Sequence, residues 1–104
     1  TDLVEGTQEA LSPQEVLEDL YSTIVDRKNH PKEGSYTNYL FEKGIDKILK
    51  KCGEEATEIV IAAKNPEAEE LKYEIADFLY HLSVLMVECN LNWDDVMTEL
   101  AHRR

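Results

Sequence analysis

Cysteine is nearly absent from this sequence of 104 residues, which contains only Cys52 and Cys89. Two thiols are too few for the disulfide framework of a small secreted domain, and their spacing matches no metal-binding motif. We therefore expect a reduced, cytoplasmic protein. Long apolar runs are absent too, since none approaches the roughly 20 residues that span a bilayer, so we expect no membrane partner.

Positive charge is scarce, because 22 acidic residues stand against 11 lysines and arginines and the net charge is −11. A chain of this charge does not bind nucleic acid or an anionic membrane through bulk electrostatics. It can still bind a small substrate that carries phosphates if divalent cations bridge the two anions. The charge balance therefore already favours a metal.

Residues 1–11 are acidic and have little of the charged-then-apolar plan of a signal peptide, so we expect them not to be one. We expect them to be a flexible N-terminal lead-in to one domain over residues 12–104. Hydrophobic residues make up 42% and charged residues 32% of the chain, which is typical of a folded soluble domain.

Proline and glycine are few and stand almost entirely where helices begin or end. Ser12-Pro13-Gln14-Glu15 has the form of an N-cap, a first-turn proline and a capping box, and apolar residues at helical spacing continue to about Lys28. Residues 29–35 form a loop. Residues 36–64 are expected to be helical, either continuous or broken at Gly44.

Asn65 and Pro66 end this helical segment, and Pro66 opens the next helix, which extends to about Glu88. Asn92 and Asp95 form a weaker capping pattern for a short last helix. No alternating strand pattern is present. The sequence therefore predicts an all-α fold, a small helical bundle with a central antiparallel helix hairpin.

Both helices of the hairpin carry acids three residues apart, namely Glu55 with Glu58 and Glu74 with Asp77. At about 100° per residue, each pair lies on the same flank of the apolar face of its helix. Antiparallel packing then places all four carboxylates on one side of the hairpin. Such a cluster is unfavourable without a cation, and oxygen ligands without His or Cys favour Mg²⁺ or Mn²⁺ over Zn²⁺.

The competing interpretation is a non-enzymatic helical interaction module whose acids only make its surface soluble. A solvated helix face normally carries Lys or Arg four residues after its acids. Neither residue type follows at that spacing after Glu54, Glu55, Glu74 or Asp77. This absence favours the metal site.

Three further side chains lie on the acidic stripe, and each has two interpretations. Lys47 and Lys51 either meet phosphate oxygens beside the metal or form weak Lys–Glu pairs, worth roughly 0.3 kcal/mol each. His81 either orients a carboxylate or touches the substrate, or it is a partly buried structural residue.

The second helix of the hairpin is apolar on two sides. We assign one apolar face of each helix to the core: Leu71, Ile75, Phe78, Leu79, Leu82 and Met86, opposite Ile45, Leu49, Cys52, Ala56, Ile59, Val60 and Ala63. The remaining apolar residues of the hairpin form a second strip, which must be buried against something else: Tyr73, Tyr80, Val84 and Val87, with Ile61 on the other helix. A two-fold homodimer is the simplest cover, and it would complete the bundle.

The segments around these acids resemble one family, the phosphoribosyl-ATP pyrophosphohydrolases, which belong to the MazG-like all-α pyrophosphatases. The resemblance covers about residues 17–100. Its motifs are SYTNYLF at 35–41, Gly44-x-x-Lys47-Ile48-x-Lys50-Lys51, GEEATE at 53–58 and Glu74-x-Ala76-Asp77-x-x-Tyr80-His81. It implies a dimeric helical enzyme that hydrolyses phosphoribosyl-ATP to phosphoribosyl-AMP and pyrophosphate, the second step of histidine biosynthesis.

The resemblance and the acidic stripe together suggest how the site residues are used. The acid quartet would hold Mg²⁺, which activates the attacking water, and Glu54 or Glu58 would orient or deprotonate that water. Tyr36, Thr37 and Asn38 either contact the ribose or phosphates, or only cap and pack their helix. A MazG-like house-cleaning pyrophosphohydrolase for ordinary or damaged nucleotides is the alternative. Such an enzyme would not need the SYTNYLF segment at 35–41 or the KILKK segment at 47–51.

Overall fold

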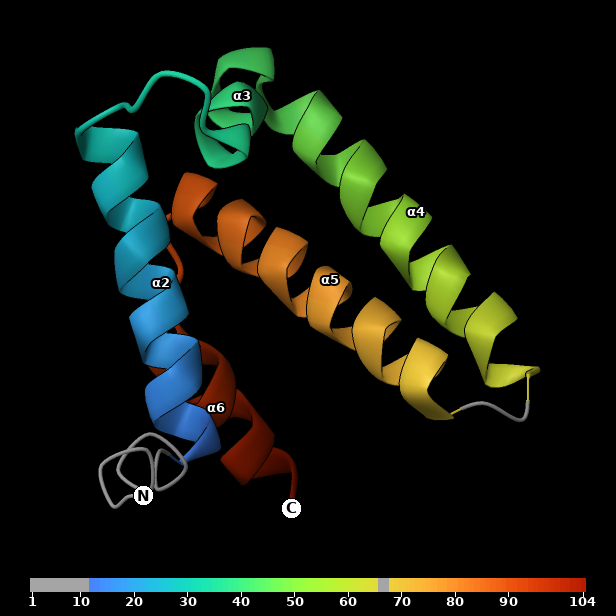
Figure 1. Cartoon of the computed structure of the whole chain (residues 1–104). Coiled ribbons are helices and arrows are strands. Elements are labelled where there is room, and N and C mark those ends of the chain that lie inside the picture. The colour runs from blue at the N-terminus through green and yellow to red at the C-terminus, as the bar shows by residue number, and fades with distance from the viewer. Residues whose placement is uncertain (1–11, 66–67) are drawn as a thin grey trace, which may run out of the picture.

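The computed structural model describes residues 12–65 and 68–104, and this part of the chain contains five helices and no strand (Figure 1). The helices are α2 (Pro13–Asn29), α3 (Tyr36–Lys43), α4 (Ile45–Ala63), α5 (Ala68–Glu88) and α6 (Trp93–Arg103). The predicted all-α fold is confirmed. The predicted lead-in over residues 1–11 and the predicted helix start at Pro66 lie outside the described residues.

Two helix starts follow from local hydrogen bonds. Ser12 Oγ accepts from the backbone N–H of Glu15, and the Ser12 N–H donates to the Glu15 carboxylate over 2.8 Å, so the predicted capping box of α2 is confirmed. Asn92 and Asp95 form the same reciprocal pair at the start of α6. Each such cap stabilises its helix by about 1 kcal/mol.

Gly44 separates α3 from α4, so the segment 36–64 is broken rather than continuous. Its φ of +97° is a conformation that residues with a side chain rarely adopt. Its N–H donates to the carbonyl of Leu40 over 3.1 Å, which ends α3, and α4 begins at the next residue. The chain therefore changes direction here without losing helical structure on either side.

The hairpin of α4 and α5 dominates the bundle, and the two helices run antiparallel side by side (Figure 1). Helix α2 packs against α5, and α3 fills the space between α2 and the start of α4. The core contains one or two residues from each of these four helices: Ile24, Leu40, Ile48, Val84 and Val87. Within residues 12–65 and 68–104, no helix has the length and apolar character to cross a membrane.

The assignment of the two apolar sides of the hairpin was partly wrong, although Met86 is buried and Ile61 and Tyr73 are exposed as expected. Val84 and Val87, placed on the strip awaiting a partner chain, are 0% and 5% exposed inside this chain, because α2 and α3 cover that side of α5. Val60 and Ile75, assigned to the core, are 62% and 41% exposed. Both sides are comparably apolar, so helical periodicity alone could not choose between them.

Candidate functional site

Three carboxylates from the two helices of the hairpin meet at one point. Glu55 and Glu58 of α4 and Glu74 of α5 each offer an oxygen within 4.8 Å of the others. Glu55 is buried, Glu74 is half-buried and Glu58 is exposed. Within the described residues, Glu55 Oε1 and Glu74 Oε1 are shielded from solvent and have no hydrogen-bond partner. Buried carboxylate oxygens are normally paired, so these two oxygens are free to accept a cation.

The crowding of acids shifts a titration. A hydrogen bond with the Glu58 carboxyl, then burial, then the charges of Glu58, Asp77 and Glu55 raise the pKa of Glu74 to about 7. Near neutral pH the Glu74 carboxyl is therefore protonated part of the time. Asp77 is exposed and lies outside the compact group of three, so the structure places it at the edge of the cluster.

Lys51 is the cation nearest to the cluster. Its Nζ lies 3.2 Å from Glu54 Oε1 and 3.8 Å from Glu55 Oε2. The contact with Glu54 raises the pKa of Lys51 despite its partial burial, so the side chain stays charged. Glu54, one of the two acids considered for orienting water, is therefore held by a lysine, whereas Glu58 faces the other acids.

His81 is buried, and both of its ring nitrogens are bound within the chain. Nδ1 lies 2.9 Å from the carbonyl oxygen of Asp77, which can only accept, so Nδ1 carries the proton. Nε2 lies 3.1 Å from the hydroxyl of Tyr36 and accepts from it in the neutral ring. His81 thus orients the Tyr36 hydroxyl and joins α5 to α3.

Thr37 and Asn38 also have partners within the chain. The Thr37 hydroxyl hydrogen-bonds the hydroxyl of Tyr80, and burial raises the pKa of that phenol. The Asn38 amide donates to the carbonyl of Arg27 over 2.6 Å and accepts from the N–H of Lys32 over 2.8 Å. These bonds attach α3 and the preceding loop to α2 and α5, and they position Tyr36 beside His81.

Lys47 forms no ion pair with an acid of the described residues and lies in a group with Lys43 and Tyr39 that was not predicted. Its Nζ lies 5.8 Å from the centre of the Tyr39 ring, and the Nζ of Lys43 lies 5.7 Å from the same point. A signal for this group was present in the sequence, since Tyr39, Lys43 and Lys47 recur at intervals of four residues and continue to Lys51 and Glu55.

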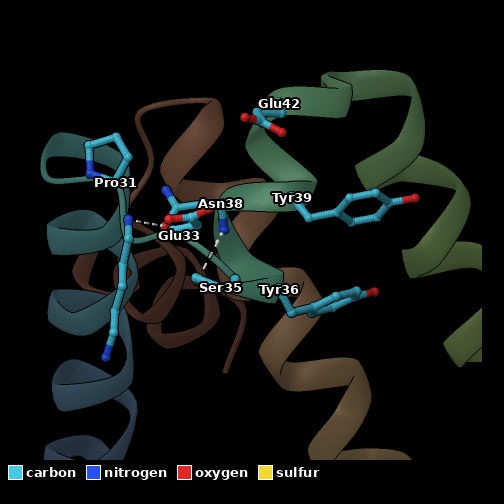
Figure 2. A pocket seen from close by; sticks show the side chains of 9 residues that line it. Pro31, Glu33, Ser35, Tyr36, Asn38, Tyr39 and Glu42 are labelled. Atoms are coloured by element: carbon cyan, nitrogen blue, oxygen red, sulfur yellow. Dashed lines mark hydrogen bonds between the residues drawn. The ribbon is translucent and has the colours of Figure 1, made fainter.

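Two hollows adjoin these groups. The larger, of about 720 Å³, lies between the α2–α3 loop and α3, and Figure 2 shows Tyr36 and Tyr39 among its lining side chains. The smaller, of about 200 Å³, is lined by Glu58 and Glu74 together with Ile61, Ala62 and Glu70. The acids therefore border the smaller hollow, and the aromatic rings border the larger one.

Comparisons with known proteins agree on one family. The sequence model of a family described as phosphoribosyl-ATP pyrophosphohydrolase matches residues 17–104. The phosphoribosyl-ATP pyrophosphatase of Limosilactobacillus fermentum is 61% identical over 87 residues, which cover 84% of this chain and 82% of that protein. The protein of the same name from Streptococcus thermophilus is 60% identical over 89 residues, with 86% of each chain covered.

Bifunctional relatives are much longer than this chain. A histidine biosynthesis bifunctional protein of Caldanaerobacter subterraneus subsp. tengcongensis is 61% identical over 89 residues, which are 86% of this chain and 43% of that protein. The chain therefore spans less than half the length of this bifunctional relative, and the likeness concerns only the shared part.

Proposed function

The chain belongs to the phosphoribosyl-ATP pyrophosphohydrolase family, and we propose that it performs that hydrolysis at the carboxylate cluster of α4 and α5. The reaction splits phosphoribosyl-ATP into phosphoribosyl-AMP and pyrophosphate, the second step of histidine biosynthesis. The observation that carries this proposal is the approach of three carboxylates from two helices to within 4.8 Å. Such a cluster suits a substrate whose phosphates are bridged to the protein by a cation.

We propose Mg²⁺, with Mn²⁺ as a substitute, as this cation. Glu55, Glu58 and Glu74 would hold it, and Asp77 would add a fourth carboxylate. The residues fit such an ion because two of their buried oxygens have no partner within the described structure, and because hard divalent cations prefer oxygen donors. When bound, the ion supplies charge neutralisation and Lewis-acid activation of the attacking water.

The side chains around the cluster supply the remaining chemistry. Glu58 is exposed beside the other acids, so its carboxylate is placed to orient the attacking water or accept its proton. Glu54 is the second candidate, although it lies 3.2 Å from the Lys51 ammonium. The positive charge of Lys51 offsets the negative charge that builds on the departing pyrophosphate.

Pyrophosphate release tests the substrate and the cation together. The assay compares phosphoribosyl-ATP with a panel of nucleoside triphosphates, each with Mg²⁺ and with a chelator. We expect release that depends on Mg²⁺ and a preference for phosphoribosyl-ATP. A preference for a plain nucleotide contradicts the proposed substrate, and full activity in chelator contradicts the proposed cation.

Two isosteric variants test the acids themselves. Glu58→Gln and Asp77→Asn are expected to lose Mg²⁺-dependent activity by orders of magnitude while their helical circular dichroism is retained. Asp19→Asn, an exposed acid on α2 outside the cluster, is the matched control and keeps full activity. Full activity in both cluster variants would mean that these acids are only surface charge.

We further propose that two copies of the chain associate in the cytoplasm. Large apolar residues on the α4–α5 hairpin are 38–62% exposed: Ile45, Leu49, Val60, Ile61, Tyr73 and Ile75. Both cysteines are free thiols, which suits a reducing compartment. Light scattering at micromolar concentration is expected to give a dimer, and Val60→Glu is expected to weaken it. A monomeric wild type contradicts the association.

A further inference from the structure

We propose that Tyr39, Lys43 and Lys47 bind the phosphoribosyl end of the substrate and so select phosphoribosyl-ATP over ATP. This inference rests on the proposed function, because it assumes that the triphosphate of the same molecule lies at the carboxylate cluster. ATP offers that cluster the same triphosphate. The two molecules differ only in the phosphoribosyl group attached to the adenine, so a second contact is needed to distinguish them.

Two ammonium groups converge on one aromatic ring where α3 meets α4. Lys43 Nζ and Lys47 Nζ lie 5.7 and 5.8 Å from the centre of the Tyr39 ring, which is the range of cation–π interactions. The Tyr36 ring stacks beside it, with 5.9 Å between centres and 23° between planes. Figure 2 shows both rings projecting from α3 in nearly the same direction. Two positive charges are thus held next to a planar aromatic surface.

These two lysines have no acidic partner among the residues that the structure describes. Lys51, one turn further along α4, lies 3.2 Å from Glu54 and is already paired. Several lysines of the described part are unpaired, but only Lys43 and Lys47 share one aromatic ring. Their charge is available to an anionic ligand, and a phosphate group accepts hydrogen bonds from two ammonium groups at once.

The carboxylates and the unpaired lysines lie at separate points along the chain, and the substrate likewise carries phosphate at both of its ends. On α4, the rise of 1.5 Å per residue puts Lys51 about 6 Å and Lys47 about 12 Å from Glu55 along the helix axis. The unpaired Lys47 therefore lies about two helical turns from the carboxylates, with the paired Lys51 between them. Phosphoribosyl-ATP has a triphosphate at one end, a purine in the middle and a phosphate at the other end.

The larger hollow provides room for the middle of the substrate beside Tyr36 and Tyr39, and Lys43 follows Glu42 at its border. Its volume of about 720 Å³ lies within the roughly 300–1,000 Å³ of small-molecule sites. Tyr36 and Tyr39 are 45% and 38% exposed, so purine stacking has free aromatic surface. Ser35 and Glu42 line the same hollow and carry acceptors suited to ribose hydroxyls.

The test compares phosphoribosyl-ATP with ATP in a double variant, Lys43→Gln with Lys47→Gln. Hydrolysis of phosphoribosyl-ATP is measured directly, and ATP is measured as a competitive inhibitor. We expect kcat/KM to fall roughly 100-fold, mainly through KM, because each ammonium–phosphate contact is worth about tenfold or more. The inhibition constant of ATP is expected to change by less than about threefold. ATP lacks the phosphate of the phosphoribosyl group, and the charges of the two lysines are screened from the distant triphosphate.

Two tyrosine variants test the ring. Tyr39→Phe is expected to keep the selectivity, because the ring and not the hydroxyl contacts both ammonium groups. Tyr39→Leu is expected to lose about tenfold of it, since it removes both the cation–π contacts and the stacking surface. Equal selectivity in the two variants would contradict a role for the ring.

Lys72→Gln is the matched control, because Lys72 lies 5.4 Å from the centre of an exposed tyrosine ring, that of Tyr73, on α5. It is expected to leave both kinetic values unchanged. If the double variant binds phosphoribosyl-ATP and ATP more weakly by the same factor, the two lysines contact the triphosphate and the inference is overturned. Unchanged kinetics in the double variant would also overturn it. A wild type that does not hydrolyse phosphoribosyl-ATP contradicts the proposed function, whereas an active wild type with an equally selective double variant refutes only this subsite.

Discussion

Neutralising Glu58 is expected to shift the stability of the protein in opposite directions without and with Mg²⁺. Without metal, a Glu58 oxygen lies within 4.8 Å of the Glu55 carboxylate. Coulomb's law at that separation gives a repulsion of about 0.9 kcal/mol in water and about 3.5 kcal/mol at an effective dielectric constant of about 20. Because Glu58 is exposed, the lower value applies, and Glu58→Gln is expected to stabilise the metal-free protein by about 1 kcal/mol.

Bound Mg²⁺ reverses this order. An ion that binds only the folded state stabilises it by about 2.7 kcal/mol at a concentration 100 times its Kd. Glu58→Gln removes one charged ligand, so the variant gains much less from the same concentration of Mg²⁺. The wild type is then the more stable protein. For a domain of this size, 1 kcal/mol corresponds to a shift in Tm of roughly 4–8 °C.

Thermal unfolding followed by circular dichroism measures both effects, at one protein concentration, in chelator and in Mg²⁺. Asp19→Asn removes an exposed acid away from the cluster. It is expected to change the Tm by no more than about 2 °C, both in chelator and in Mg²⁺. The reasoning is refuted if Glu58→Gln is destabilised in chelator and gains as much from Mg²⁺ as the wild type. That result would mean that the carboxylates neither repel one another nor bind an ion.

Further predictions concern Glu74, Gly53 and Asn38. The pKa of Glu74 rises from 4.5 to about 7 on folding, so protonation favours the folded state, and the stability of the metal-free protein is expected to fall as pH rises from about 4.5 to 7. Mg²⁺ must displace this proton, so calorimetry is expected to show that the affinity for Mg²⁺ weakens by about tenfold per pH unit below 7. A stability or an affinity that does not change with pH would contradict the corresponding prediction. Gly53→Ala is expected to raise the free energy of unfolding by about 1 kcal/mol in urea titrations, because a Cβ there meets nothing within 4 Å; destabilisation would show that this face is occupied. Asn38→Ala is expected to lower it by about 1–3 kcal/mol, because the hydrogen bonds to Arg27 and Lys32 are lost, and no change would mean that these bonds are dispensable.

Helix boundaries could be predicted because they depend on residues close in sequence. Ser12 and Asn92 cap their helices through acids three positions later, and Gly44 breaks the helical segment through its own backbone conformation. The convergence of Glu55 and Glu74 required one more assumption, antiparallel packing of neighbouring helices, and the short connection near residue 65 made that assumption safe.

The partners of individual polar side chains could not be predicted, because they come from elements far apart in sequence. His81 is held by a tyrosine 45 positions earlier, and Asn38 by a carbonyl of the preceding helix. The joint approach of Lys43 and Lys47 to Tyr39 depends on the angle that α3 and α4 make at Gly44. Helical spacing placed Lys47 and Lys51 on the acidic stripe, and it could not show that only Lys51 keeps an acid as its partner.

The sequence by itself determined the helices, the shared flank of the acids and the oxygen-only character of the cluster, because these follow from spacing and side-chain chemistry. Only the tertiary structure decided which apolar side of the hairpin is buried. Val84 and Val87 are core residues because α2 and α3 pack on them, while Val60 and Ile75 stay exposed. A helix with two apolar sides satisfies the same periodicity in either orientation, and only the packing of the other helices distinguishes them.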